Sequence, residues 1–149
     1  CMLKLSTRVR YGTRALVQLA DAYPGQALSV SDMATAQRLS PKYLERIMAA
    51  LKHAGLVRAT RGITGGYQLT RPPENVRMTD VVSALEGPTC VVACVRAPET
   101  CAMHEMCPTR DLWGTIQGAF DSIMQHTTLM DLVERKRSKA TEQSATYCI

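Results

Sequence analysis

The chain has 149 residues, of which 46% are hydrophobic, 5% aromatic and 21% charged, and it carries a net charge of +5. This length suits one domain of ordinary size with an appendage. No run approaches the roughly 18 apolar residues that a membrane-spanning helix needs, and the first residues lack the apolar core of a signal peptide. We therefore expect a cytoplasmic protein, and a reducing compartment disfavours a disulfide knot for the six cysteines.

Charge is distributed unevenly along the chain. Residues 1–77 carry twelve Lys and Arg against four Asp and Glu, whereas residues 78–149 carry six against nine. A basic half joined to an acidic half indicates a polyanion-binding module followed by a part with another role. We favour nucleic acid as the polyanion over the alternative of an ordinary solvated surface.

Two helices are expected first. Residues 8–22 place Val, Leu and Ala at helical spacing, and Pro24 follows directly. Ser29 or Ser31 can cap a second, short helix that runs to about Gln37.

A third helix is expected to begin at Ser40, with its hydroxyl as the N-cap and Pro41 at the first helical position. It should run to His53, because Gly55 is a natural stop. One face is apolar at i, i+3, i+4 and i+7 spacing (Leu44, Ile47, Met48 and Leu51). Two helices joined by a tight turn, the second with a polar face, are typical of a helix-turn-helix.

Residues 56–71, LVRATRGITGGYQLTR, predict a hairpin with a basic, glycine-rich tip. A hairpin directly after the second helix of such a pair is a wing. Arg58, Arg61 and Arg71 would place positive charge on it, near DNA phosphates or a minor groove.

The rest of the chain predicts a short helix, a loop and a long helix. In residues 77–87, Thr79 is the expected cap, Asp80 favours the positive helix end and Gly87 is the stop. Residues 111–136 predict one long helix with an apolar face that packs on its copy in a dimer. That face holds Leu112, Ile116, Ala119, Phe120, Ile123 and Met124.

The stretch between these helices, CVVACVRAPETCAMHEMC, holds Cys90, Cys94, Cys101 and Cys107. Zinc sites usually show C-x-x-C pairs, and none occurs here. The open spacing favours an iron–sulfur cluster held in a loop. Zinc, thiol redox sensing and plain structural cysteine stay open.

Several segments, in order, resemble the family of dimeric winged-helix repressors that includes IscR, NsrR and RirA. They are KLSTRVRYGTRAL, SPKYLERIMAALKHAGLV, RATRGITGGYQLTRP, MTDVVSALEG, CPTRDLW and TTLMDLV, within residues 2–134. The resemblance implies a transcription regulator that senses iron–sulfur, iron, nitric oxide or redox status. The fold implied is mainly α with a small β wing, as a winged helix-turn-helix domain plus a long C-terminal dimerisation helix. Its parts would be 2–87 for DNA binding, 88–108 for the cysteine-rich loop, 109–134 for dimerisation and 135–149 as a disordered tail.

The resemblance also implies the cluster ligands. The family's three cluster cysteines match Cys94, Cys101 and Cys107, for a [2Fe–2S] or [4Fe–4S] cluster. The histidine that completes the site in IscR is replaced by Arg110, which cannot ligate, and Arg8–Arg10 offers no acid where NsrR-like members have one. His104 and Cys90 are the candidates for the fourth ligand, beside a small molecule or a residue of a partner chain.

For operator DNA, the resemblance implies contacts from the third helix and the wing. These residues are Ser40, Lys42, Tyr43, Glu45, Arg46, Arg58, Arg61, Gly62, Gly65 and Gly66. Glu45 can accept from cytosine N4, and Arg61 matches a wing arginine expected in the minor groove. Tyr43 at the core edge and a solvated Glu45 are the alternatives.

Two other classes compete with a cluster-bearing regulator. One is a zinc-stabilised or thiol-redox winged-helix regulator without a cluster. The other is an enzyme, which we disfavour because the sequence contains no Ser-His-Asp set, H-E-x-x-H motif or phosphate loop, and His53, His104 and His126 are scattered.

Overall fold

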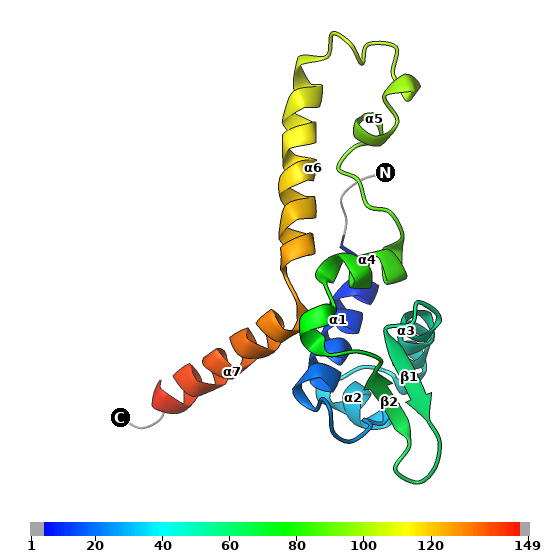
Figure 1. Cartoon of the computed structure of the whole chain (residues 1–149), viewed down its shortest axis with the longest axis vertical. Helices are drawn as coiled ribbons and strands as arrows, with labels where there is room; N and C mark the ends of the chain where they lie inside the picture. Colours follow the sequence, from blue (N-terminus) through cyan, green and yellow to red (C-terminus); the bar gives the residue numbers. More distant parts are fainter. Residues whose placement is uncertain (1–4, 147–149) are drawn as a thin grey trace.

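The computed structural model describes residues 5–146, so Cys1 and Cys148 lie outside the described residues. The elements are α1 (Thr7–Asp21), α2 (Val30–Gln37), α3 (Pro41–His53), β1 (Val57–Thr60), β2 (Gly66–Leu69), α4 (Met78–Glu86), α5 (Ala93–Arg96), α6 (Pro108–His126) and α7 (Leu129–Thr146). In Figure 1, α1–α4 and the hairpin form a lower body, α6 rises from it beside the α5 loop, and α7 projects sideways. No helix between residues 5 and 146 is long and apolar enough to cross a membrane.

The core lies where α1, α3 and α4 meet. The predicted apolar face of α3 is fully buried, as is the inner face of α1 (Leu44, Ile47, Met48, Leu51, Ala15 and Leu16). Leu129 and Val133 of α7 are also fully buried, so the first turns of α7 belong to this core. Each buried Leu, Ile, Met or Val side chain stabilises the fold by about 1.5–3 kcal/mol through its removal from water.

The helix-turn-helix forms as the sequence predicts, apart from one cap. The Ser29 hydroxyl accepts from the backbone N–H of Asp32 at 3.0 Å and starts α2. Arg38 ends α2 with φ +54°, and α3 begins at Pro41 after Ser40. The Ser40 hydroxyl makes no capping bond, so the prediction of a hydroxyl cap there is wrong. The Pro41 ring pre-sets the first turn, which leaves the hydroxyl exposed.

The predicted hairpin is an antiparallel pair running from Val57 opposite Leu69 to Thr60 opposite Gly66. Its second strand is tied to the body by two backbone bonds between Leu28 and Tyr67, of 3.0 and 2.9 Å. A Cβ at Gly66 would lie 2.2 Å from the carbonyl oxygen of Leu28. Only glycine lets the wing approach the start of α2 this closely.

The start of α4 corrects the predicted cap. The helix begins at Met78, one residue before Thr79, so Thr79 lies inside the first turn and its buried hydroxyl has no hydrogen-bond partner among the described residues. The Asp80 carboxylate instead accepts from the backbone N–H of Arg77 at 3.2 Å. Gly87 ends the helix with φ +75°, as expected.

The C-terminal region differs from the single long helix and disordered tail that the sequence predicts. The helix breaks between α6 and α7, because Thr128 and Asp131 cap α7 reciprocally. Asp131 accepts from the Thr128 backbone at 2.7 Å, while the Thr128 hydroxyl accepts from the Asp131 N–H at 3.2 Å. These bonds from Thr128 lower the pKa of Asp131. Beyond residue 134, α7 continues to Thr146 as a helix rich in good helix formers, and its residues 135–144 are exposed.

Candidate nucleic-acid interface and cysteine loop

The beginning of α3 presents the polar residues that the sequence analysis selects. Ser40, Lys42, Glu45 and Arg46 are exposed. Tyr43 is half-buried, and its ring meets that of Tyr11 edge-on at 6.3 Å. The Tyr43 hydroxyl lies 3.4 Å from that of Thr7. The aromatic pair therefore fixes the face of α3 that carries the exposed polar groups.

The hairpin lies beside α3 (Figure 1) and carries its own exposed residues. Arg61 at its tip is exposed and forms no ion pair with any described residue, whereas Arg58 donates to the Gln68 side chain at 3.3 Å across the strands. Ile63, which the sequence analysis missed, is fully exposed at the tip. The sequence could have indicated this exposure, because Ile63 is an apolar residue within a glycine-rich turn that lies too far from the core to be buried.

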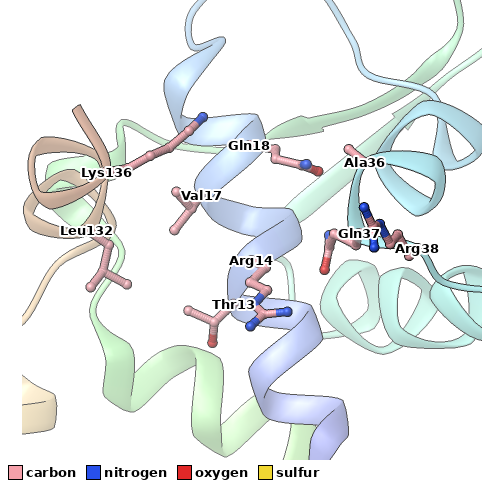
Figure 2. A pocket seen from close by; sticks show the side chains of 9 residues that line it. All are labelled: Thr13, Arg14, Val17, Gln18, Ala36, Gln37, Arg38, Leu132 and Lys136. Carbon is pink, nitrogen blue, oxygen red and sulfur yellow. The ribbon is translucent and has the colours of Figure 1, made fainter. Parts of the chain in front are cut away.

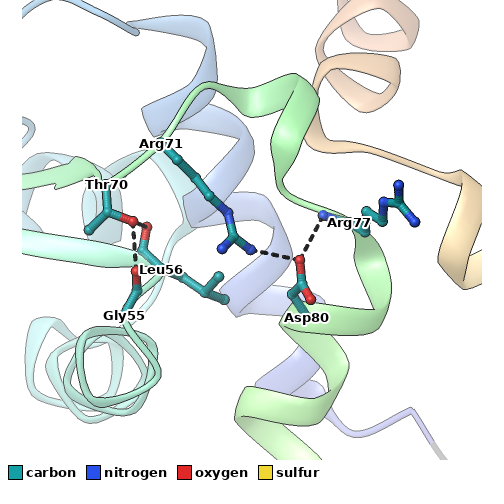
Figure 3. A network of polar contacts seen from close by, with 6 residues as sticks. All are labelled: Gly55, Leu56, Thr70, Arg71, Arg77 and Asp80. Carbon is teal, nitrogen blue, oxygen red and sulfur yellow. Dashed lines mark hydrogen bonds and ion pairs between the residues drawn. The ribbon is translucent and has the colours of Figure 1, made fainter.

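Arg71 does not extend the charged tip of the wing, contrary to the sequence prediction. Its guanidinium forms a 2.7 Å ion pair with Asp80 in the first turn of α4 (Figure 3). The neighbouring Thr70 hydroxyl donates to the carbonyl oxygen of Gly55 at 2.6 Å. Arg71 and Thr70 thus fasten the base of the wing to α4 and to the end of α3.

The cysteine loop joins α4 to α6. Cys94 lies in α5, Cys101 follows a 3₁₀ turn and Cys107 precedes the first residue of α6. All three are free, half-buried thiols. Within residues 5–146, no three His, Cys, Asp or Glu side chains come close enough together to hold a metal ion. The loop thus supplies thiol donors without gathering them at one point.

The two candidates for a fourth ligand differ in their surroundings. His104 Nδ1 lies 2.8 Å from the carbonyl oxygen of Cys101. A carbonyl only accepts, so Nδ1 carries the proton and the lone pair of the neutral ring is on Nε2, where a metal can bind. Cys90 is 4% exposed and disulfide-bonded, so it could ligate only after reduction. Arg110 donates to the His104 carbonyl at 3.3 Å and helps to shape the loop.

Cys107 lies at the start of α6, where hydrogen-bond donors surround its sulfur. Its sulfur lies 3.3 Å from the Thr109 hydroxyl, and bonds from Thr109 and the Arg110 backbone lower the pKa of the thiol. These donors sit in the first turn of α6, where the helix favours negative charge.

Two polar contacts connect the cysteine loop to the helices around it. The Gln117 side chain of α6 is buried; its oxygen accepts from the Val91 backbone at 2.7 Å, and its nitrogen donates to Asp121 at 2.8 Å. At the other end, the Ser6 hydroxyl, which caps α1, donates to the carboxylate of Glu86. The loop therefore starts from a point held by both α1 and α6.

The fold and these surfaces define a winged-helix protein whose third helix exposes polar residues beside the wing. The family model described as "Rrf2: Iron-dependent Transcriptional regulator" matches residues 5–135. The chain belongs to this family. It is a DNA-binding transcription regulator and not an enzyme, because the family is described as a transcriptional regulator and several relatives are named as HTH-type transcriptional regulators.

Individual relatives agree with this assignment. Protein rrf2 of Nitratidesulfovibrio vulgaris is 39% identical, over 88% of this chain and 87% of its own length. The CymR structure from Bacillus subtilis is 34% identical with a TM-score of 0.79, over 90% of this chain and 98% of that one. The T. potens IscR structure is 30% identical with a TM-score of 0.73, and the match covers 90% of this chain and 88% of that one.

Proposed function

We propose that the protein is a homodimeric repressor that binds operator DNA. It would sense iron–sulfur, iron, nitric oxide or redox status through an iron–sulfur cluster on Cys94, Cys101 and Cys107. The observation that carries the proposal is the position of three free thiols on the one loop between the DNA-binding body and α6. Similarity to a solved IscR and the iron-dependent description of the family support it.

DNA would be read by the start of α3 and steered by the wing. Lys42 and Arg46 suit phosphates or guanine, and Glu45 suits the amino group of cytosine. Arg61 and the exposed Ile63 would enter the adjacent minor groove, where arginine and apolar side chains are used together. Gly62, Gly65 and Gly66 keep this tip slim enough for close approach.

A second copy would pair along α6. Gln117 is its only buried residue, while Leu112, Ile116 and Ile123 are 53%, 37% and 64% exposed. An apolar stripe of this kind on a 19-residue helix, about 28 Å long, is usually covered by a partner. Two-fold pairing would place two recognition helices at a fixed spacing, which palindromic operators require.

Three thiols fit an iron–sulfur cluster as donors, and His104 Nε2 fits as a fourth ligand, but the loop must close around the group because its donors are apart. When bound, a cluster would supply iron whose redox state and integrity respond to oxidants, nitric oxide and iron supply. Closure would alter the loop between the contacts made by Glu86 and Gln117. A regulator can convert such local ordering into a change of dimer geometry.

A cluster-free thiol sensor is the second candidate. The lowered pKa of Cys107 favours it, since a thiolate is the form that oxidants attack. The similar structure of Staphylococcus aureus CymR in an oxidised form, 32% identical, is consistent with thiol chemistry in this family. A structural zinc ion on the same cysteines is the remaining variant of this candidate.

Protein purified without oxygen separates these candidates. We expect visible charge-transfer absorption, with iron and acid-labile sulfide in matched amounts, and loss of both in Cys94→Ala, Cys101→Ala and Cys107→Ala. Lys139→Gln, an exposed change on α7, is the control and should keep the cluster. Colourless protein with zinc, or with only free thiols, would reject the cluster and leave the second candidate.

DNA recognition is tested separately with duplexes selected from a random 40-base-pair pool. Glu45→Gln should change the selected sequence. Arg61→Gln should weaken binding and reduce the slope of the logarithm of the binding constant against the logarithm of salt concentration by about one. Lys139→Gln, an exposed change on α7, is the control. Unchanged selection and affinity in both variants would refute the assigned interface.

A further inference from the structure

A groove of about 560 Å³ crosses the surface of α1, with α2 on one side and α7 on the other (Figure 2). Its wall residues come from all three helices: Thr13, Arg14, Val17, Gln18, Ala36, Gln37, Arg38, Leu132 and Lys136. It lies apart from the cysteine loop and from the exposed face of α3. Neither DNA contact nor thiol chemistry explains it.

The rim of the groove is positively charged. Arg14 and Arg38 are exposed, and neither forms an ion pair with a residue of the described chain. Lys136 is held at 2.7 Å by Asp21. Two free guanidinium groups facing one groove favour a carboxylate, which they can bind with paired hydrogen bonds.

The walls contain polar atoms that have no partner. Thr13 Oγ1, Gln18 Oε1 and both amide atoms of Gln37 are shielded from solvent and form no hydrogen bond within the described residues. Six such side-chain atoms occur in residues 5–146, and four of them belong to residues that line this groove. Since buried polar groups are normally satisfied, their concentration here indicates an occupant that offers both donors and acceptors.

The groove also has an apolar part formed by Val17, Ala36 and Leu132. Its volume falls in the range of about 300–1,000 Å³ that is typical of small-molecule sites. An inorganic anion would satisfy the arginines but would leave the apolar part uncovered and give no donor to Gln18 Oε1.

We propose that this groove binds a small organic acid with at least one carboxylate, a short carbon body and a hydrogen-bond donor such as a hydroxyl or ammonium group. The carboxylate pairs with Arg14 and Arg38, the donor meets Gln18 or Gln37, and the carbon body covers Val17 and Leu132. The proposal rests on groove residues alone and is independent of the cluster.

A ligand in the groove would affect the position of the DNA-binding helix. The Arg14 guanidinium lies 5.6 Å from the centre of the Tyr11 ring, and that ring meets Tyr43 of α3. Arg38 forms the turn between α2 and α3. A ligand that draws these two arginines together therefore acts on both ends of the turn that positions the recognition helix.

The test uses the full-length protein without DNA. Malate, aspartate and succinate share a four-carbon dicarboxylate skeleton, and only the first two carry a donor. With a wider panel of two- to six-carbon organic acids and sulfate at equal ionic strength, binding is measured by calorimetry and thermal unfolding. We expect a donor-bearing acid to bind and to shift the side-chain amide NMR signals of Gln18 and Gln37.

Variants decide whether the groove is the site. Arg14→Gln and Arg38→Gln should each weaken binding roughly tenfold, as expected for loss of a charge-assisted bond, whereas Lys139→Gln should not. Gln37→Met should raise the unfolding temperature of the free protein, because it removes an unpaired amide. The same change should reduce the rise in unfolding temperature that the ligand causes. This opposite pair of effects would not arise from a merely misfolded variant.

Three results would overturn the proposal. The first is that no acid of the panel binds the wild type more tightly than the Arg14→Gln/Arg38→Gln double variant. The second is that sulfate binds as well as the organic acids, which would make the groove a general anion patch. The third is that the double variant changes the mass of the dimer in sedimentation, which would assign the groove to a second copy. Repeating the titration with Cys94→Ala keeps the result separate from the cluster.

Discussion

Replacing Gly66 with alanine should detach the wing from the body. The new Cβ would lie 2.2 Å from the Leu28 oxygen, 2.5 Å from its carbonyl carbon and 2.9 Å from the Ser29 nitrogen. All three are backbone atoms at the start of α2, so no side-chain rotation relieves the collision. The strand must move away, and the two backbone bonds between Leu28 and Tyr67 are then lost.

The cost follows from these contacts. Two backbone hydrogen bonds contribute about 1 kcal/mol each, and a φ of +156° adds about 1–2 kcal/mol for a residue with a Cβ. We therefore expect Gly66→Ala to lower the free energy of unfolding by about 3–4 kcal/mol. With a urea m-value of about 2 kcal/mol per molar, the midpoint falls by about 1.5–2 M.

Gly55→Ala is the matched control. Gly55 has φ +76°, but its added Cβ would meet no atom within 4 Å. Conformational strain alone should cost about 1 kcal/mol there. Urea unfolding of both variants, followed by circular dichroism, separates collision from strain. Equal losses in the two proteins would refute the argument that backbone contact, rather than glycine's freedom, sets the requirement at Gly66.

Three further changes have defined outcomes. Asp80→Asn should cost about 1 kcal/mol or less, since the Arg71 pair is 41% and 39% exposed, yet it should weaken DNA binding by loosening the wing; unchanged affinity on a selected duplex would contradict this. Gln117→Met should leave the Val91 N–H unpaired, at a cost of about 1–3 kcal/mol, and peptides spanning residues 88–92 should exchange amide hydrogens about tenfold faster or more by mass spectrometry. Hydrogen bonds from two cations of α7 lower the pKa of Asp21 below 3.8, so its stabilising effect is fully present above that pH and is lost as the pH falls through the lowered value. Asp21→Asn should therefore reduce stability at pH 7 and have a smaller effect as the medium becomes strongly acidic, and an effect that does not change with pH would contradict the assignment.

Most of the DNA-binding body could be predicted from its sequence because its signals are local. The i, i+3, i+4, i+7 pattern of α3 identifies the four side chains that are buried, and Ser29 and Gly55 mark helix ends by ordinary capping chemistry. The errors arose where two local signals compete. Thr79 resembles a cap, but the carboxylate of Asp80 can reach the Arg77 N–H, and this places the cap at Arg77, two residues earlier.

The break between α6 and α7 also had a local signal, which an apolar repeat obscured. The repeat continues from Ile123 through Leu129 and favours one helix, while Thr128 and Asp131 form a capping pair that starts a new one. Burial decides between them. Leu129 packs into the core only if the chain turns at Thr127, whose carbonyl accepts from the Met78 N–H at 2.9 Å.

Features that depend on contacts between distant segments left no signal in the sequence. The groove needs Gln18 of α1, Gln37 of α2 and Leu132 of α7 to meet, and nothing in their spacing along the chain predicts that. The role of Arg71 is of the same kind, because a basic residue near a wing suits DNA until Asp80 lies within 2.7 Å of it.

These distant contacts give the cysteine loop a physical route to the wing. The loop begins just after α4, whose last residue, Glu86, accepts a hydrogen bond from Ser6 and whose third residue, Asp80, holds Arg71 at the base of the wing. Since α4 is a short helix of nine residues with a buried apolar face, a displacement of one end would also displace the other. If cluster binding closes the loop, a shift at the end of α4 would reach its first turn, and the Arg71 ion pair would pass it to the strand that carries Gly66. Asp80→Asn should therefore weaken this connection between the loop and the wing as well as loosen the base of the wing itself.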